Sequence, residues 1–344
     1  MAKSRSGAGL PVLRVQGSPT EVGRAIGETF RAKLAEVVES TREMIGTLTG
    51  VEALIRDKLG ARLASAQRYV PELYAQLAAT AEAAGVSFEL LAYLNAGGYR
   101  PEVPVGGTGG CTSIVSRGAD GVVVGHNEDA EPSGLEDLYL IDATVQVPGG
   151  RRSRFLGLNY VQTLPGVSAT LNEHGLIVLS DALEDFEPGE GVPTDFLARA
   201  LLDQETIDGA VAFVRGVPRG GASNFLLVQG QRIVNLEVAS ERLEVREILE
   251  DSFAHSNHYL EPALACLAEA PRQHSVQRLT RARELVTPAL RIEQMKHILA
   301  DRQGPPDSLC RDRTVGAFIG HSARREVEVC WGEPDSGTWT VHAL

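Results

Sequence analysis

Apolar residues recur every three to four positions through most of the first hundred residues, which is typical of helices. A short apolar run at residues 10–15 predicts a strand in front of them. Helices are then expected from about 19 to 46, from 51 to 84 with a break near Pro71, and from 87 to 94. The apolar face of the first helix should consist of Val22, Ile26, Phe30, Leu34, Val37 and Val38. The first hundred residues are therefore predicted to be almost entirely helical.

The pattern changes after residue 110 to short alternating or β-branched runs separated by turns, which predicts strands. The expected strands are 112–115, 122–125, 139–147, 154–158, 168–171, 176–180, 224–228, 232–238, 243–248, 315–319, 326–331 and 338–342. The expected helices are 194–203, 206–214, 262–268, 275–285 and 292–300. Antiparallel strands interleaved with helix pairs fit two stacked sheets covered by helices. The predicted class is α+β, in one globular unit.

Composition supports a globular protein and narrows the choice of partners. Of 344 residues, 43% are hydrophobic, which is enough for a large core. The formal net charge of -12 repels phosphate backbones, so nucleic acid is not expected as a partner. The four cysteines form no C-x-x-C pair and are expected to be free thiols. Without a signal peptide or a bilayer-spanning apolar run, we expect a cytoplasmic protein with no membrane partner.

Cys111 follows a segment rich in glycine and proline and opens the first strand predicted after it. Most free cysteines are small buried hydrophobes, which is the simplest interpretation of Cys111 taken alone. Gly109 and Gly110 favour another one, because glycine permits the strained backbone that an attack of the thiol on the Gly110 carbonyl requires. An acyl shift from nitrogen to sulfur, followed by hydrolysis, would then release Cys111 as a new N-terminus.

A released Cys111 would carry its own base. An α-amine has a pKa near 8, so part of it is unprotonated at neutral pH and can take the thiol proton without a histidine. Asp129 ends a strand predicted to form a hairpin with the Cys111 strand, and it is either a holder of the new ammonium or a solvated turn residue. Asn224 starts an apolar strand, and it either donates to an oxyanion or caps a turn.

The ordered set of motifs resembles the penicillin acyltransferase family of N-terminal-nucleophile hydrolases. The motifs, in chain order, are GCTS, GHNED, NEHGL, ASNFLL and HSNHYL, after an opening helix that begins GSPTEVGRAIGE. The resemblance runs from about residue 17 to 283 and implies a four-layer αββα fold. It also implies roles for Cys111 as nucleophile, Gly110 before the cut, Ser113 in self-cleavage, Asp129 at the amine, Asn224 at the oxyanion and Arg278 near the site. Arg281 and Arg283 compete with Arg278 in this alignment.

One position departs from the related choloylglycine hydrolases, which commonly have an arginine three residues before the aspartate. Here that residue is His126, which is either a substrate-binding residue with a tunable charge or a histidine at a strand edge. His255 and His258 suggest a metal pair, but a real site needs three or four ligands. We therefore expect Asn257 and His258 to line a substrate pocket, with no metal and no cofactor.

These residues lead to a functional hypothesis with two alternatives. We expect a chain that cuts itself into a helical fragment, 1–110, and a catalytic fragment, 111–344, which stay associated. The product would hydrolyse a linear amide bond of a small acyl-amide or peptide through an acyl-thioester at Cys111. The first alternative is an acyl-CoA-dependent N-acyltransferase that uses the same site. The second is a non-catalytic small-molecule binding protein.

Overall fold

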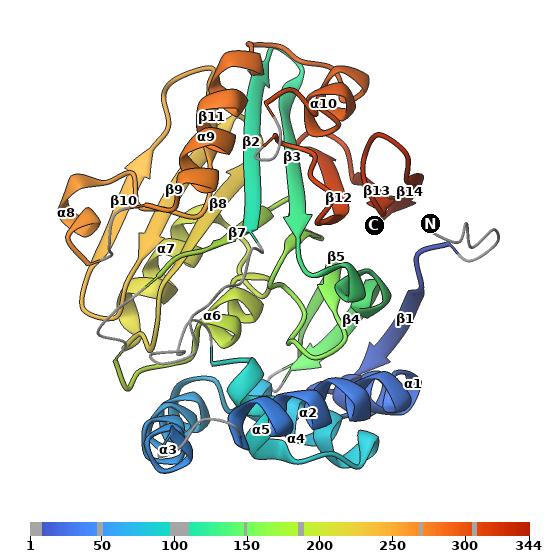
Figure 1. The fold of residues 1–344 in the computed structure, drawn as a ribbon, viewed down its shortest axis with the longest axis vertical. Coiled ribbons are helices and arrows are strands. Elements are labelled where there is room, and N and C mark those ends of the chain that lie inside the picture. Colours follow the sequence, from blue (N-terminus) through green and yellow to red (C-terminus); the bar gives the residue numbers. More distant parts are fainter. Residues whose placement is uncertain are drawn as a thin grey trace.

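The computed structural model describes residues 9–46, 51–96, 110–147, 150–184, 189–267, 271–304 and 308–344. Of the glycine- and proline-rich segment predicted before Cys111, only Gly110 lies within these ranges. The described chain forms two β-sheets between two groups of helices (Figure 1). Within the described part of the chain, no helix is long and apolar enough to cross a membrane.

The larger sheet has eight strands in the order β1-β4-β5-β6-β7-β8-β9-β10. The strands are β1 (Val12–Gly17), β4 (Leu138–Val147), β5 (Arg151–Tyr160), β6 (Ala169–Asn172), β7 (Ile177–Ala182), β8 (Ser223–Gln229), β9 (Arg232–Val238) and β10 (Leu243–Glu247). All neighbouring pairs are antiparallel except β1 and β4, which are parallel. The first strand of the chain thus forms one edge of a sheet that is otherwise built from residues beyond 137.

The smaller sheet has six strands in the order β11-β2-β3-β12-β13-β14, all antiparallel. They are β11 (Ser252–His255), β2 (Gly110–Gly118), β3 (Gly121–Asp129), β12 (Thr314–His321), β13 (Glu326–Trp331) and β14 (Thr338–Ala343). The predicted strand at 112–115 is therefore longer at both ends. Its extension to Gly110 matters, because it brings Cys111 into the hydrogen-bonded ladder.

Helices cover the outer face of each sheet. On the larger sheet lie α1 (Pro19–Thr29), α2 (Arg31–Gly46), α3 (Val51–Tyr69), α4 (Pro71–Ala84), α5 (Phe88–Leu94), α6 (Thr194–Leu201) and α7 (Ile207–Gly216). On the smaller sheet lie α9 (Gln273–Leu285) and α10 (Ile292–Leu299). The short helices η1 (Pro132–Asp137) and α8 (Pro262–Ala265) join strands and other helices. Figure 1 shows α1 to α5 at one end of the molecule and α9 and α10 at the other.

Three apolar cores follow from this layering. Alternate residues of the larger sheet, such as Tyr139 and Ile141, pack against its helices. Their neighbours Leu138 and Leu140 face the smaller sheet and form the core between the sheets. A third core lies between the smaller sheet and α9 and α10. Helix, sheet, sheet and helix are thus four layers, and the expected α+β class with two stacked sheets is confirmed.

The first predicted helix is two helices, and its packing on α4 explains two of its glycines. A Cβ atom on Gly27 would lie 2.4 Å from the Thr80 carbonyl oxygen, and one on Gly23 would lie 2.1 Å from that of Gln76. Glycine at these positions therefore lets α1 approach α4 closely.

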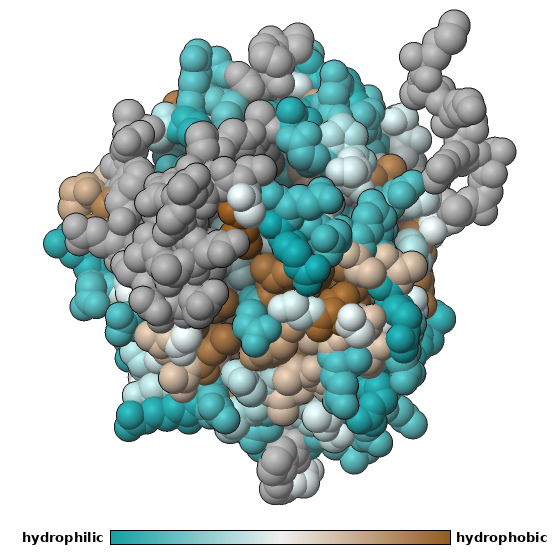
Figure 2. Space-filling model, turned by 60° about the horizontal axis from the view of Figure 1, so that its bottom comes forward, coloured by the Kyte–Doolittle hydropathy of each residue, from teal (hydrophilic) through white to brown (hydrophobic). Residues whose placement is uncertain are grey.

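On the face turned forward in Figure 2, apolar side chains gather near the centre and hydrophilic ones surround them.

Candidate active site

The β2–β3 hairpin positions the candidate nucleophile. Its register pairs Gly110 with Asp129, Cys111 with Glu128 and Ser113 with His126, as the predicted hairpin requires. Directly opposed residues of an antiparallel pair point to the same face of a sheet, and successive residues alternate. Glu128 therefore shares a face with Cys111, whereas Asp129 points to the other face.

The face that carries Cys111 points into the space between the two sheets. Most of that space is filled by apolar side chains such as Val115 and Val124. Around Cys111 the core-facing positions are polar instead. They are occupied by Ser113, His126, Glu128, Tyr160, Asp181, Asn224, Glu237 and His255, of which all but the half-buried Tyr160 are buried. One end of the sandwich interior is thus a polar site with a half-buried cysteine at its margin.

The Cys111 thiol faces a carboxylate that other side chains hold in place. The Cys111 Sγ atom lies 3.7 Å from Glu128 Oε2, and the Tyr160 hydroxyl donates to the same oxygen at 2.9 Å. The other oxygen of Glu128 lies 2.9 Å from His126 Nε2. Burial, followed by the charges of Glu128 and Asp181, raises the pKa of the Cys111 thiol well above its usual value. The thiol is therefore neutral near pH 7 and needs a base before it can attack.

Two histidines continue this network into the protein. The Ser113 hydroxyl donates to Asp181 Oδ1 at 3.0 Å and lies 2.9 Å from His126 Nδ1. Since the single hydroxyl proton goes to Asp181, Ser113 accepts from His126, and both ring nitrogens of His126 are donors. Burial opposes the charged ring, but the hydrogen bond to Glu128 and the charges of Glu128, Asp181 and Asp129 together outweigh it and raise the pKa of His126.

His255 is held in a similar way between two carboxylates. Its Nδ1 atom lies 3.2 Å from Asp181 Oδ2, and its Nε2 atom lies 3.1 Å from Glu237 Oε1. Burial again opposes the charge, and the two hydrogen bonds raise the pKa of His255 above its usual value. For Asp181, burial is outweighed by the combined effect of the two histidines and the hydrogen bond from Ser113, so its pKa is lowered. The network thus alternates anionic and cationic groups from Glu128 to Glu237.

Asn257 and Arg278 hold the backbone of Cys111 from the other side. The Cys111 N–H donates to Asn257 Oδ1 at 2.8 Å, and Arg278 donates to the same oxygen at 2.7 Å. Arg278 also donates to the Cys111 carbonyl oxygen and, at 2.7 Å, to Thr112 Oγ1. A Cβ atom on Gly110 would lie 2.6 Å from both Arg278 and Asn257. The residue before the expected cut must therefore be glycine for this arrangement to form.

Comparison with known proteins identifies the family. Residues 116–336, more than half of the chain, match the family described as acyl-coenzyme A:6-aminopenicillanic acid acyl-transferase. The chain belongs to this family. The matched region begins five residues after Cys111. The family assignment expected from the motifs is confirmed, and the family is described as one of acyltransferases.

Two further similarities accompany this acyltransferase-family match. The beta-alanyl-dopamine/carcinine hydrolase of Drosophila melanogaster is 25% identical over 252 residues, which cover 67% of this chain. The chain spans 65% of the length of that relative. Two variant structures of conjugated bile acid hydrolase from Clostridium perfringens are 11% and 10% identical, with TM-scores of 0.40 and 0.38. Each covers 68% of this chain and 97% of the bile acid hydrolase.

Three residues predicted for the site of this acyltransferase-family chain make their hydrogen bonds to groups other than the thiol. Asp129 accepts hydrogen bonds from Thr314 at 2.6 Å and Arg311 at 3.1 Å. Asn224 donates to Asp181 at 3.3 Å, and its own Oδ1 atom has no hydrogen-bond partner among the described residues. His258 is hydrogen-bonded to Ser275 at 2.8 Å, and burial lowers the pKa of its ring to about 4. The roles expected for these residues stay predictions.

The structure adds Glu128, Tyr160, Asp181, Glu237 and His255 to the residues predicted from the sequence. Their signal in the sequence was a polar residue within or at the end of an apolar strand, which does not by itself show the face on which the side chain lies. In the described part of the chain, Cys111, His126 and Glu128 also have possible metal-binding atoms within 4.8 Å of one another. The histidine and the carboxylate of this group are hydrogen-bonded to each other, so their arrangement is explained without an ion, and we assign none.

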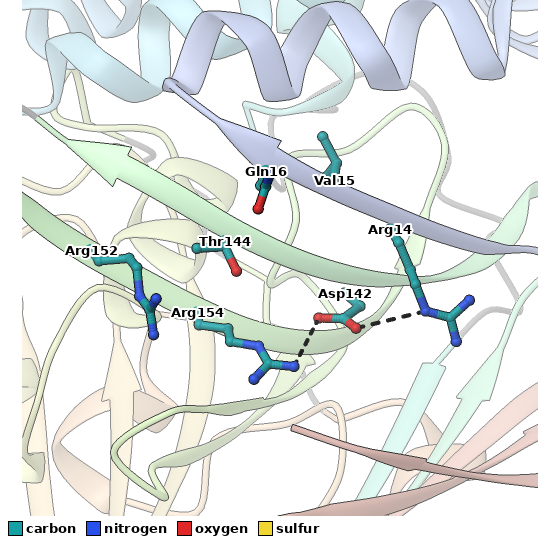
Figure 3. A pocket seen from close by; sticks show the side chains of 7 residues that line it. All are labelled: Arg14, Val15, Gln16, Asp142, Thr144, Arg152 and Arg154. Atoms are coloured by element: carbon teal, nitrogen blue, oxygen red, sulfur yellow. Dashed lines mark ion pairs between the residues drawn. The ribbon is translucent and has the colours of Figure 1, made fainter.

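A groove elsewhere on the surface of this acyltransferase-family protein lies apart from the candidate active site. It has a volume of about 390 Å³ and lies across β1, β4 and β5 (Figure 3). Asp142 lies 3.9 Å from Arg14 and 3.8 Å from Arg154. Arg154 is six residues before Tyr160 on β5, which corresponds to roughly 20 Å along a strand. The groove is therefore remote from the thiol, and its exposed ion pairs explain its polar lining.

Proposed function

We propose that this protein is a self-processing amide hydrolase whose nucleophile is Cys111. The observation that carries the proposal is the half-buried Cys111 thiol at the start of β2, directly after Gly110, with its backbone N–H held by Asn257 and its sulfur next to Glu128. A structural cysteine needs neither a preceding glycine that fits between Arg278 and Asn257 nor a polar network beneath it. Membership of an acyltransferase family supports the same chemistry.

In the proposed maturation, the Cys111 sulfur attacks the Gly110 carbonyl carbon and the chain separates into residues 1–110 and 111–344. Ser113, which joins His126 to Asp181, would hold this part of the network during the step. The fragments are expected to stay associated, because β1 is hydrogen-bonded to β4 and because α1 to α5 share an apolar core with the larger sheet.

In the proposed turnover, the free α-amine of Cys111 takes the thiol proton and the thiolate attacks the carbonyl carbon of an amide. The amine product leaves with a proton, and water hydrolyses the acyl-thioester. Asn257 and the carboxylate of Asp129 are proposed to orient the α-amine. Asn224 is proposed to donate to the oxyanion, which in known enzymes contributes roughly 3 to 4 kcal/mol. One N–H of the Asn224 amide donates to Asp181, and the second N–H is the one proposed for the oxyanion.

The proposed substrate is a small linear amide or a short peptide. The Drosophila relative is by its name a hydrolase of beta-alanyl-dopamine and carcinine, which supports small amides as the first compounds to test. The family description favours a second candidate, transfer of an acyl group between coenzyme A and an amine. Both activities use the same acyl-thioester, and they differ only in whether water or an amine accepts the acyl group.

The test compares purified wild type with a Cys111→Ala variant by denaturing electrophoresis and intact mass. We expect two fragments from wild type, with Cys111 as a new N-terminus, and one uncut chain from the variant. The same samples are then assayed with small amides and with acyl-CoA plus an amine. A variant that retains turnover would refute the proposed nucleophile. A wild-type chain that stays whole and inactive would favour a non-catalytic binding protein.

A further inference from the structure

The proposed self-cleavage needs a side chain that takes the proton of the Cys111 thiol, whereas in the mature enzyme the α-amine of Cys111 serves as this base. After cleavage, the α-amine of Cys111 can accept the thiol proton. Before cleavage that nitrogen belongs to a peptide bond, and its hydrogen is donated to Asn257. An amide nitrogen has no basic lone pair, so it cannot deprotonate the thiol. Burial and neighbouring carboxylates also raise the pKa of Cys111, so few molecules ionise spontaneously.

Among the described side chains near the thiol, one is placed to take its proton. Among the described residues, Glu128 is the side chain whose oxygen lies within hydrogen-bonding distance of the Cys111 sulfur, at 3.7 Å. His126 and His255 have both ring nitrogens engaged with oxygen atoms. The carboxylate of Asp181 is occupied by Ser113, His255 and Asn224.

We propose that Glu128 is the general base of self-cleavage, an inference that rests on the self-processing proposed above. Glu128 Oε2 takes the proton from Cys111 Sγ, and the thiolate forms a bond to the Gly110 carbonyl carbon. The bond between that carbon and the Cys111 nitrogen then breaks, and Glu128 returns the proton to the leaving nitrogen. Water hydrolyses the resulting thioester, which leaves a carboxylate on Gly110 and a free thiol and amine on Cys111. One water is consumed, and Glu128 is regenerated.

Neighbouring groups fix the carboxylate of Glu128 for this role. The strand register places it opposite Cys111, and the side chain is buried. His126 holds Oε1, and Tyr160 donates to Oε2, so the second oxygen keeps a lone pair that faces the thiol. Asp129, the adjacent carboxylate, cannot replace it because its oxygens are held by Thr314 and Arg311 on the opposite face of β3.

The experiment follows fragment formation by the full-length chain over time, by intact mass, in wild type and three variants. Glu128→Gln keeps the shape of the side chain but removes the base, and we expect cleavage to slow by about 100-fold or more, the usual contribution of a general base. Glu82→Gln makes the same chemical change at an exposed position of α4, on the outer side of the larger sheet, and we expect the wild-type rate. Glu128→Ala leaves space for a small carboxylate, and we expect added formate to increase its cleavage rate.

The outcomes separate this inference from the proposed function. Slow cleavage in folded Glu128→Gln together with formate rescue of Glu128→Ala supports Glu128 as the base. Cleavage of Glu128→Gln at the wild-type rate, or the absence of formate rescue in a folded Glu128→Ala protein, overturns the inference and leaves self-processing at Cys111 intact. A wild-type chain that never cuts overturns both. Circular dichroism of each variant distinguishes slow chemistry from failure to fold.

Discussion

Asn257 is the acceptor on which the backbone of the candidate nucleophile depends. Its Oδ1 atom accepts from the Cys111 N–H at 2.8 Å and from Arg278 at 2.7 Å. Asn257→Ala removes both of these hydrogen bonds and also the donation from Nδ2 to the Ala182 carbonyl oxygen at 3.0 Å. A neutral hydrogen bond contributes about 1 kcal/mol and one from a charged group about 1.5–3 kcal/mol. Asn257 is half-buried and Arg278 keeps two other acceptors, so water and those groups offset part of the loss.

We therefore expect Asn257→Ala to lower the free energy of unfolding by about 2 kcal/mol. The measurement is urea unfolding in a Cys111→Ala background, which keeps the backbone N–H and prevents cleavage from complicating the comparison. Asn257→Asp is the matched control, because it keeps an acceptor oxygen next to Arg278 and loses only the donation to Ala182. Its loss should be smaller, about 1 kcal/mol or less.

The same change should also slow self-cleavage in a chain that retains Cys111. Loss of the hydrogen bond to the Cys111 N–H frees the peptide unit that must face the thiol. A loss of about 1.4 kcal/mol in orientation corresponds to a tenfold lower rate. Equal unfolding free energies for Asn257→Ala and its parent, within about 0.5 kcal/mol, would refute the reasoning, since that is the range of substitutions that remove no interaction.

Two further predictions concern stability. Burial raises the pKa of Asp195 to about 8, so its contribution to stability is complete below its ordinary pKa of about 4 and is lost as pH rises toward 8. We expect Asp195→Asn to remove this loss, and therefore to raise the melting temperature at pH 8 but not at pH 4. If the melting temperatures of wild type and variant differed by the same amount at every pH, the prediction would be wrong. Gly27→Ala should lower the free energy of unfolding by about 1–3 kcal/mol through its contact with the Thr80 carbonyl. The control is Gly60→Ala, at an exposed helix position with open space around it, and it should raise the free energy of unfolding by up to about 1 kcal/mol. Equal changes in the free energy of unfolding at both sites would contradict close packing of α1 on α4.

Local patterns predicted the elements well because each reflects which face of an element is buried. The apolar runs of β8 and β9 and the helical spacing of α9 are each visible within the element itself. The break between α1 and α2 was missed, because the nearest glycine, Gly27, lies inside α1 and the helical spacing of apolar residues continues through Phe30. The parallel pairing of β1 with β4 was also missed. Residues more than a hundred positions apart make this pair, and nothing within either strand specifies its partner.

The candidate site shows where such patterns stop being informative. The run His126, Asn127, Glu128, Asp129 contains four polar residues in succession, so alternation cannot tell which of them face the core. Only the register with β2 shows that His126 and Glu128 face Cys111, and that Asn127 and Asp129 face α9 and α10. The sequence drew attention to Asp129, while the structure brings Glu128 to the thiol.

The charges inside the sandwich connect the two stages of the proposed chemistry. Three carboxylates, those of Glu128, Asp181 and Glu237, are balanced there by two histidines whose raised pKa values favour the charged ring. Burial, together with the remaining negative charge, raises the pKa of the Cys111 thiol and keeps it neutral in the uncut chain. Cleavage adds an α-amine next to this charge. When that amine takes the thiol proton, the resulting ammonium compensates the carboxylates that opposed a thiolate. On this reasoning, the cut that creates the nucleophile's base also removes the electrostatic barrier to its ionisation.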